Sequence, residues 1–168
     1  MNSLSPDEAR KEFRKCCGSE NWAGRMVDER PFVNVDELLG KADSIWWSLE
    51  PDDWLAAFRS HPKIGERKAA EEVADQARAW SEAEQSGTRD AAEETAQALS
   101  EGNREYEQRF GYIFIVCATG KTAEEMLGIL RERLSNDSDK ELRVAAEEQR
   151  KITRLRLKKL VGSLESRV

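Results

Sequence analysis

Hydrophobic residues recur along this chain at intervals of three and four positions, the spacing that places them on one face of an α-helix. The segment after Asn34 shows the pattern clearly in Leu38, Ala42 and Ile45. The same spacing predicts helices over residues 5–16, 20–28, 35–48, 52–60, 67–80, 88–109, 122–134 and 138–164. The sequence therefore predicts an all-α fold, a single-domain bundle of about eight helices over residues 1–168.

Helix starts are marked by capping boxes, in which a serine or threonine is followed three residues later by a glutamate. The motifs SPDE at Ser5, TAEE at Thr122 and SDKE at Ser138 have this form. No proline follows Pro62, so none interrupts the later helices. One run, YIFIVCAT at 112–119, is rich in β-branched and aromatic residues. It could be a lone strand, but a strand needs a partner, so we expect an extended or helical buried segment.

The composition argues against several classes of function. Hydrophobic residues, at 39%, suffice for a core, whereas the net charge of −6 argues against nucleic-acid binding, which needs a concentrated basic surface. No apolar run reaches the roughly 18 residues that a membrane span requires. The N-terminal MNSLSPDEARKEF is too polar for a secretory signal, and SLESRV is not a peroxisomal signal. Cys16, Cys17 and Cys117 lack metal-site spacing, so we expect a reduced, cytoplasmic protein without a metal.

The motif ATGKTAEE at 118–125 resembles a phosphate-binding loop. A Walker A motif needs a glycine five residues before its Gly-Lys pair, and Ile115 occupies that position. We therefore interpret Gly120 as the end of the buried segment and Thr122 as a helix cap, without a nucleotide site.

His61 is the only histidine of the chain, and it stands directly before Pro62 at the end of a predicted helix. Proline disfavours the helical conformation for the residue before it, so the imidazole is held at a break in the backbone. Its reference pKa, about 6.5, allows it to donate or accept a proton at neutral pH. A helix-stop role without chemistry is the alternative.

Arg156 falls on the apolar face of the last predicted helix, between Ile152 and Leu160. A guanidinium directed at a core requires a carboxylate or an anionic ligand, because an unpaired buried charge is unfavourable. An internal salt bridge, or a side chain that reaches solvent along its aliphatic stem, is equally consistent with the pattern.

Five motifs follow one another along the chain: HPKIGE at 61–66, WSEAEQ at 80–85, NREYEQRFGYIFIVCATGKTAEEML at 103–127, RERLSND at 131–137 and ELRVAAEEQRKITRLRL at 141–157. Together they resemble the 2-oxo-4-hydroxy-4-carboxy-5-ureidoimidazoline (OHCU) decarboxylases of urate breakdown. The combination is specific, whereas each motif alone is weak; WSEAEQ, for example, is also typical of a solvated helix end. The motifs cover most of residues 55–160, and the first 50 residues match only loosely.

The resemblance implies a homodimer that converts OHCU to (S)-allantoin and CO2 without a cofactor. It places the active-site histidine on His61, which we expect to act as general acid/base, and a second catalytic residue on Glu84. The implied substrate-binding positions are Pro62, Ser81, Glu82, Ala83, Gln85, Phe114, Ile115, Val116, Cys117, Ala118 and Arg156. The expected partner is this small-molecule substrate, with neither nucleic acid nor membrane.

Two other interpretations are consistent with the sequence. A helical interaction module without activity would explain the acidic helices and leave His61 as a helix-stop residue. A relative that acts on a different ureido or imidazoline acid would share the same motifs. A closed pocket that joins His61, Glu84 and Arg156 would favour an enzyme, whereas an open hydrophilic surface at His61 would favour the module.

Overall fold

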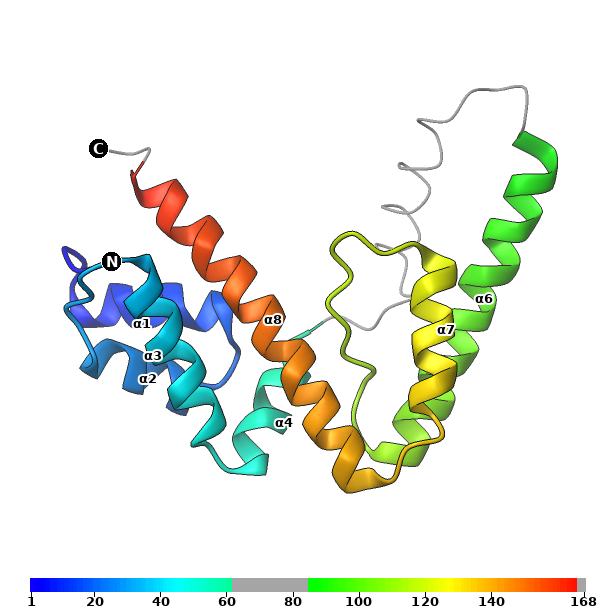
Figure 1. Cartoon of the computed structure of the whole chain (residues 1–168), viewed down its shortest axis with the longest axis horizontal. Helices are drawn as coiled ribbons and strands as arrows, with labels where there is room; N and C mark the ends of the chain where they lie inside the picture. The colour runs from blue at the N-terminus through cyan, green and yellow to red at the C-terminus, as the bar shows by residue number, and fades with distance from the viewer. Residues whose placement is uncertain (62–84, 166–168) are drawn as a thin grey trace. The chain divides into compact units, whose positions relative to one another are not determined.

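The computed structural model of the chain describes residues 1–61 and 85–165, with the side chains of 85–92 and 165 left out (Figure 1). Regular structure in these ranges is entirely α-helical, which confirms the predicted fold class. The helices are α1 (Pro6–Cys16), α2 (Glu20–Asp28), α3 (Val35–Trp47), α4 (Pro51–Arg59), α6 (Gln85–Phe110), α7 (Ala123–Arg133) and α8 (Ser138–Glu165). None of these helices is both long and apolar enough to cross a membrane.

The observed helix ends follow the predicted ones closely. The largest difference is at the start of α6, which begins at Gln85 instead of residue 88. The helix predicted over 67–80 lies outside the described residues. The run at 112–119 is neither a helix nor, within the described ranges, a paired strand, so the extended alternative is confirmed.

Side-chain caps determine where α1 and α7 begin. Ser5 accepts a hydrogen bond from the backbone N–H of Glu8, and the Glu8 carboxylate accepts one from the N–H of Ser5. Thr122 and Glu125 exchange the same two bonds at the start of α7. Both capping boxes were predicted from sequence, and each satisfies N–H groups that have no partner within the helix.

The capping box predicted at Ser138 is wrong. Ser138 is the first residue of α8, and Asp137 caps the helix, because its Oδ1 accepts from the N–H of Lys140 at 2.9 Å. Glu141, which was expected to complete the box, is fully buried and binds Arg133. The pairing with a buried arginine explains the difference, since that charge requires a carboxylate while Asp137 already caps the helix.

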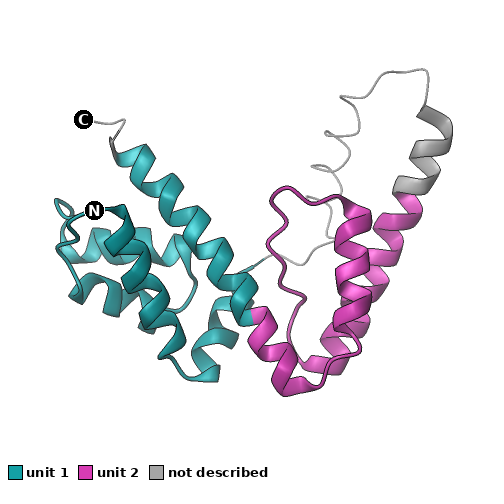
Figure 2. Ribbon diagram, in the orientation of Figure 1, with its two compact units in different colours: residues 1–61, 146–168 teal, residues 62–145 magenta. Residues whose placement is uncertain are grey.

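The chain divides into two compact units (Figure 2). Unit 1 comprises residues 1–61 and 146–168, and unit 2 comprises residues 62–145. Helix α8 contributes its first turns to unit 2 and its remainder to unit 1. A single domain over the whole chain stays a prediction.

Unit 1 packs α1 to α4 and the later part of α8 around aromatic side chains. Trp22 and Phe58 are fully buried. The indole N–H of Trp22 donates to the carbonyl oxygen of Ala42 at 3.1 Å, and that of Trp46 donates to the carbonyl oxygen of Ala146 at 2.9 Å. The second bond ties α3 to α8, so the turns of α8 that follow Ala146 are held against the core.

Unit 2 has its own core between α6, α7 and the segment that connects them. Its buried members are Leu99, Tyr106, Phe114, Val116, Met126, Leu127 and Leu130. Helices α6 and α7 approach closely at Gly102, where a Cβ atom would lie 2.6 Å from Cδ2 of Leu130. A side chain at this position would therefore require the Leu130 side chain to shift.

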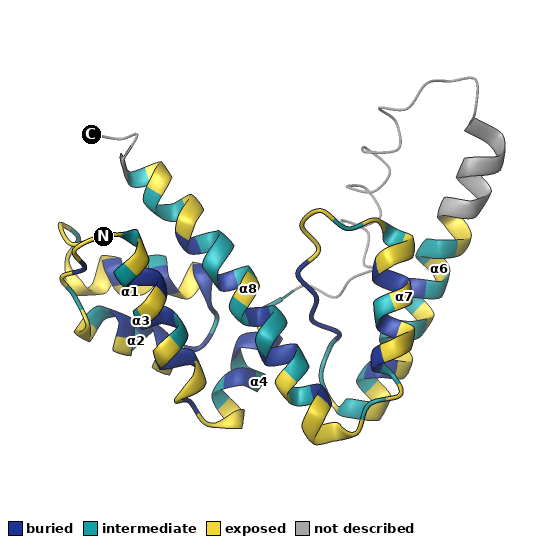
Figure 3. Ribbon diagram, viewed as in Figure 1, coloured by how far each residue is buried: buried dark blue, intermediate teal, exposed yellow. Residues whose placement is uncertain are grey.

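The connecting segment runs between two glycines in left-handed backbone conformations, Gly111 at φ +80° and Gly120 at φ +78°. Glycine adopts positive φ without the steric penalty of other residues, which explains its presence at both ends. Between them, Phe114 to Cys117 are all buried (Figure 3). The segment thus brings an extended backbone into the core of unit 2.

Candidate active site

His61 directly follows the end of α4 in unit 1. The helix ends with Ser60 as its C-cap, and the N–H of His61 donates to the carbonyl oxygen of Phe58 at 3.1 Å. This bond ties the backbone of His61 to the last turn of the helix. Its side chain is half-buried. The imidazole therefore stands at the predicted helix end, partly shielded from water.

The imidazole of His61 binds a buried amide from α8. Its Nε2 lies 2.7 Å from Oε1 of Gln149, although the two residues are far apart in sequence. Gln149 is fully buried, and its Nε2 donates to Oγ1 of Thr153, one helical turn later, at 3.1 Å. Both polar groups of the buried amide are thus satisfied, as buried polar groups require.

The surroundings of His61 favour the neutral imidazole. Burial lowers its pKa below the ordinary value, the positive charge of Arg156 lowers it further, and the hydrogen bond with Gln149 opposes both effects. Since the ordinary pKa is about 6.5, the neutral form dominates at pH 7. A neutral imidazole offers one N–H donor and one basic nitrogen, so it can carry a proton in either direction.

Arg156 is half-buried on α8, beside the end of α1. Its Nη1 lies 3.4 Å from the carbonyl oxygens of both Lys15 and Cys16. These carbonyls end α1, where a positive charge is favourable. In the described ranges Arg156 forms no ion pair, whereas Arg154, on the same helix, pairs with Asp43 at 2.7 Å. Among the described residues, no carboxylate neutralises the guanidinium of Arg156.

The buried stripe of α8 differs from the predicted one. Ile152 and Leu160, the expected neighbours of Arg156 on an apolar face, are only half-buried. The buried residues that α8 contributes to unit 1 are Ala146, Gln149, Thr153 and Leu157. Two of these are polar, and their mutual hydrogen bond permits their burial, so the stripe cannot be found from hydrophobicity alone. Arg156 lies at its border.

The cysteines near this site are not nucleophiles. Burial raises the pKa of Cys16 to about 12 and that of Cys17 to about 11. Both are therefore neutral thiols at pH 7, and a thiol is far less reactive than a thiolate. Nowhere in the described ranges do three or more histidine, cysteine or acidic side chains gather as metal ligands.

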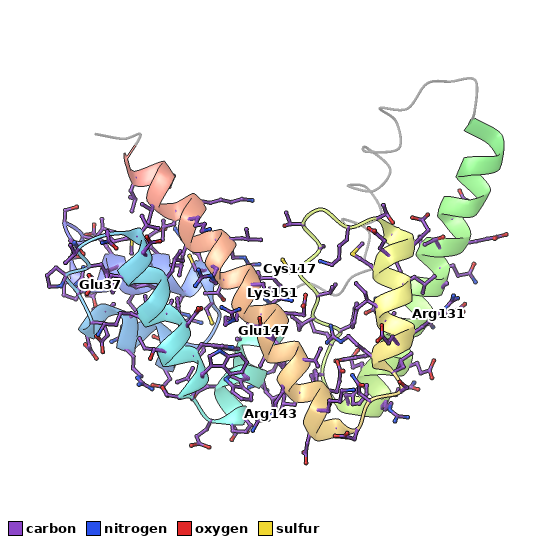
Figure 4. The ribbon with its side chains drawn as sticks, viewed as in Figure 1. Glu37, Cys117, Arg131, Arg143, Glu147 and Lys151 are labelled. Atoms are coloured by element: carbon purple, nitrogen blue, oxygen red, sulfur yellow. The ribbon has the colours of Figure 1, made fainter. Side chains whose placement is uncertain are left out.

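The segment from Phe114 to Ala118 belongs to unit 2; Figure 4 labels Cys117 on it. Phe114, Ile115 and Val116 are buried, whereas Ala118 is exposed. Within the described residues, no acceptor binds the backbone N–H groups of Phe114, Ile115 and Val116. Buried N–H groups are almost always paired in folded proteins, so this backbone has the capacity to bind a polar ligand.

A buried ion pair supports the same segment. The Nη2 of Arg133 lies 2.6 Å from Oε1 of Glu141, and its Nη1 donates to the carbonyl oxygen of Ile115 at 2.7 Å. The Tyr106 hydroxyl also donates to Glu141, and the guanidinium lies 4.6 Å from the ring centre of Phe114. These contacts fix the backbone at Ile115 from inside the core.

Sequence reasoning missed the roles of Gln149 and Arg133. The spacing of Arg133 three residues after the buried Leu130 was a usable signal, because such residues share a helix face. No local sequence pattern indicates the hydrogen bond between Gln149 and His61.

The structure brings two of the predicted side chains together, since His61 and Arg156 both lie in unit 1 and interact electrostatically. Phe114 to Ala118 lie in unit 2. Gln85 begins α6, but its side chain is not described. The remaining predicted residues, Pro62, Ser81, Glu82, Ala83 and Glu84, lie outside the described residues. A pocket that joins His61, Glu84 and Arg156 stays a prediction.

Comparison with known proteins gives a consistent set of matches. A family model described as OHCU decarboxylase matches residues 2–158. The Uric acid degradation bifunctional protein TTL of Arabidopsis thaliana is 39% identical over 150 residues, which are 89% of this chain and 46% of that protein. The chain thus spans about half the length of that relative. The 2-oxo-4-hydroxy-4-carboxy-5-ureidoimidazoline decarboxylase of Amia calva is 30% identical, over 96% of this chain and 92% of that protein.

Solved structures agree with these matches. A crystal structure of OHCU decarboxylase in the presence of (S)-allantoin has a TM-score of 0.73 and 38% identity, covering 90% of this chain and 97% of that chain. A crystal structure of (S)-allantoin synthase has a TM-score of 0.66 at 18% identity, covering 92% of this chain and 50% of that chain, and supports the fold alone.

Proposed function

Because the chain belongs to the OHCU decarboxylase family, we propose that it converts OHCU to (S)-allantoin and CO2 in urate breakdown. One observation carries the proposal beyond the family match. The sole imidazole of the chain is half-buried and neutral, and it lies near an arginine that forms no ion pair within the described residues. A proton carrier beside an uncompensated positive charge suits a reaction of an anionic substrate.

The substrate can supply its own electron sink. OHCU carries a carboxylate and a hydroxyl on one ring carbon, next to a C=N bond. As CO2 leaves, the electrons of the broken C–C bond form a double bond between the hydroxyl-bearing carbon and the carbon of the C=N group. The electrons of the C=N double bond move to the nitrogen, which takes up a proton. The resulting enol then loses its hydroxyl proton and gains a proton on the neighbouring carbon, which becomes the chiral carbon of allantoin. No cofactor is needed for this sequence of steps.

We assign to His61 the movement of a proton between the enol and the chiral carbon. General acid/base catalysis of this kind contributes typically about 10²–10⁴ in rate. The neutral state of the imidazole supports the assignment, because it can accept the hydroxyl proton and return one to carbon. Its attachment to the end of α4 supports delivery to a single face of the ring.

Arg156 is proposed to bind a substrate oxygen that gains negative charge during the reaction. Such an interaction lowers the barrier, because it is stronger in the transition state than in the bound substrate. Binding the departing carboxylate would have the opposite effect, since that group loses its charge. The weak carbonyl contacts of Arg156 support its availability for an anion.

The remaining predicted residues would hold the ring. Glu84 would accept hydrogen bonds from ring or ureido N–H groups, with Ser81 and Gln85 completing the set. Backbone N–H groups of 114–118 would bind the ring and ureido oxygens. The burial of Phe114, Ile115 and Val116, whose N–H groups have no acceptor within the described residues, supports this. We further propose a cytoplasmic homodimer.

The test is stereochemical, because OHCU loses CO2 without a catalyst and total allantoin is therefore uninformative. Freshly made OHCU in D2O should yield allantoin with one deuterium at the chiral carbon and the circular dichroism of the S form. His61→Asn should give racemic product at the background rate, whereas the exposed neighbour Arg59, changed to Asn, should leave the product chiral.

A racemic product from the wild-type protein, with CO2 released no faster than in buffer, would reject the proposal and favour a helical interaction module. Turnover of a different ureido or imidazoline acid, without turnover of OHCU, would identify a relative of altered specificity.

A further inference from the structure

Two hydrogen bonds connect the core of unit 1 to His61. They begin at Thr153, which is 5% exposed on α8. The Thr153 oxygen has two lone pairs, so it can accept a hydrogen bond from an amide N–H group.

Thr153 orients the amide of Gln149. The oxygen of Thr153 accepts from Nε2 of Gln149 at 3.1 Å, so the amide nitrogen faces Thr153 and the amide oxygen faces His61. Gln149 is fully buried and Thr153 is 5% exposed, so water does not compete for either group. Their separation by four residues places them on one face of α8.

The amide oxygen in turn determines where the imidazole proton resides. Oε1 of Gln149 lies 2.7 Å from Nε2 of His61, and an amide oxygen accepts but cannot donate. The hydrogen bond therefore requires a proton on Nε2. In a neutral imidazole the other nitrogen, Nδ1, then carries the lone pair.

On the basis of the proposed decarboxylase function, we infer that Gln149 is a positioning residue: it holds neutral His61 in the Nε2–H tautomer and leaves Nδ1 as the nitrogen that exchanges a proton with the substrate. Thr153 acts through Gln149, because its oxygen accepts a hydrogen bond from the amide nitrogen. The opposite tautomer would place the lone pair against a buried acceptor and the proton toward the substrate.

The single histidine makes this inference directly measurable. In protein labelled with ¹⁵N-histidine, the two imidazole nitrogens of His61 give the only ring signals, and their shifts report which nitrogen is protonated. In the wild-type protein, above the pKa of His61, we expect a protonated Nε2 and an unprotonated Nδ1. A protonated Nδ1 would overturn the inference. This measurement needs no substrate.

Substitutions of Gln149 separate positioning from packing. Gln149→Met fills similar space without an acceptor, so His61 should show a mixture of tautomers. We expect kcat to fall about 10-fold or more, as when a group that fixes a tautomer is lost, with KM changed by no more than roughly twofold. Gln149→Glu keeps an acceptor, so the Nε2–H tautomer should persist while the pKa of His61 and the acidic limb of the pH–rate profile both rise.

Substitutions of Thr153 act at a residue whose hydrogen bond goes to Gln149 and not, among the described residues, to His61. Thr153→Val keeps the shape but removes the acceptor for the Gln149 amide, so the tautomers of His61 should mix. Thr153→Ser keeps the hydroxyl and is the matched control, with wild-type ring shifts expected. Equal ring shifts in the valine and serine variants would contradict the role of Thr153 in orienting the Gln149 amide.

The inference and the proposed function fail in different ways. If the wild-type protein does not accelerate formation of (S)-allantoin, the proposed function is wrong, whatever the ring shifts show. If the protein is active but Gln149→Met keeps both kcat and the wild-type tautomer, the positioning role of Gln149 is wrong.

Discussion

Two arginines, one in each unit, differ in how their charge is compensated. Arg133 of unit 2 is 5% exposed and pairs with the fully buried Glu141 at 2.6 Å. Arg156 of unit 1 is half-buried, and its hydrogen bonds within the described residues go to the carbonyl oxygens of Lys15 and Cys16, both at 3.4 Å. One guanidinium is neutralised by a carboxylate, whereas no carboxylate of the described residues pairs with the other.

The difference separates an arginine that serves the fold from one that can serve a ligand. A buried charge with a carboxylate partner is strongly destabilising to break, but it has no further capacity for an anion. A half-buried charge with only long carbonyl contacts contributes little to stability and can still form charge-assisted bonds. Substitutions at the two positions should therefore affect different properties.

The largest effect should come from breaking the buried pair. Arg133→Met leaves Glu141 as an unpaired buried charge, so the free energy of unfolding should fall by about 3–5 kcal/mol. Urea unfolding measures this loss. Arg131→Met is the matched control, because Arg131 is exposed on the same helix (Figure 4), and should change the free energy by less than about 0.5 kcal/mol. Equal losses in both variants would contradict the structural role of the pair.

Arg156→Leu should show the opposite behaviour. Removing a group that stabilises developing charge should lower kcat/KM about 10²–10³-fold, whereas the lost contacts with the end of α1 should change stability by less than about 1 kcal/mol. Arg156→Lys should restore activity only in part, since a point charge lacks the planar fork.

The control for this prediction is Arg154→Leu, which removes an arginine from the same helix that already pairs with Asp43. It should keep wild-type activity. If Arg156→Leu retains activity while Arg154→Leu loses it, the functional arginine has been misidentified.

A smaller effect should follow from trimming the network around Arg133. Tyr106→Phe removes a hydroxyl that donates to Glu141 and leaves the ion pair in place. Hydrogen bonds to charged groups contribute about 1.5–3 kcal/mol, so we expect a loss near the lower value in thermal or urea unfolding. Activity should be unchanged at temperatures where the variant is folded, and a large loss of kcat would place Tyr106 in the site.

The smallest expected effect is the pH dependence of stability that His61, in unit 1, contributes. The pKa of His61 is lowered in the folded protein, so the unfolded chain binds its proton more readily. Stability contributed by neutral His61 is therefore complete above about pH 6.5 and decreases as the pH falls below that value. Comparing wild type with His61→Asn across this window isolates the effect, because the carboxylates are common to both. A wild-type protein that gains stability relative to the variant on acidification would contradict the direction.

The helices were predictable because their signals are local. Ser5 and Thr122 cap helices through residues three positions away, and the amphipathic spacing of α3 is visible in a short window. His61 was singled out by being the sole imidazole before a proline. Such features depend on neighbouring residues alone, so the sequence contains them directly.

The polar core contacts were not predictable in the same way. The partner of His61 is Gln149, on a helix far along the chain, and a glutamine on a helix carries no sign of its partner. Glu141 was misread as part of a capping box because its spacing from Ser138 fits that motif, whereas its partner Arg133 is on a different helix. Contacts between distant segments depend on how helices pack, which local periodicity does not specify.

The two glycines in left-handed conformations, one at each end of the buried segment, limit which substitutions the segment can tolerate. In the proposed site, the groups of this segment that bind the substrate belong to the main chain, which is the same for every residue except proline. Exchanges among similar apolar side chains at Ile115 or Val116 should therefore be tolerated, provided that they fill the same space. Substitutions at the two glycines should not be tolerated, because the left-handed backbone conformation, and not side-chain size, limits which residue fits there.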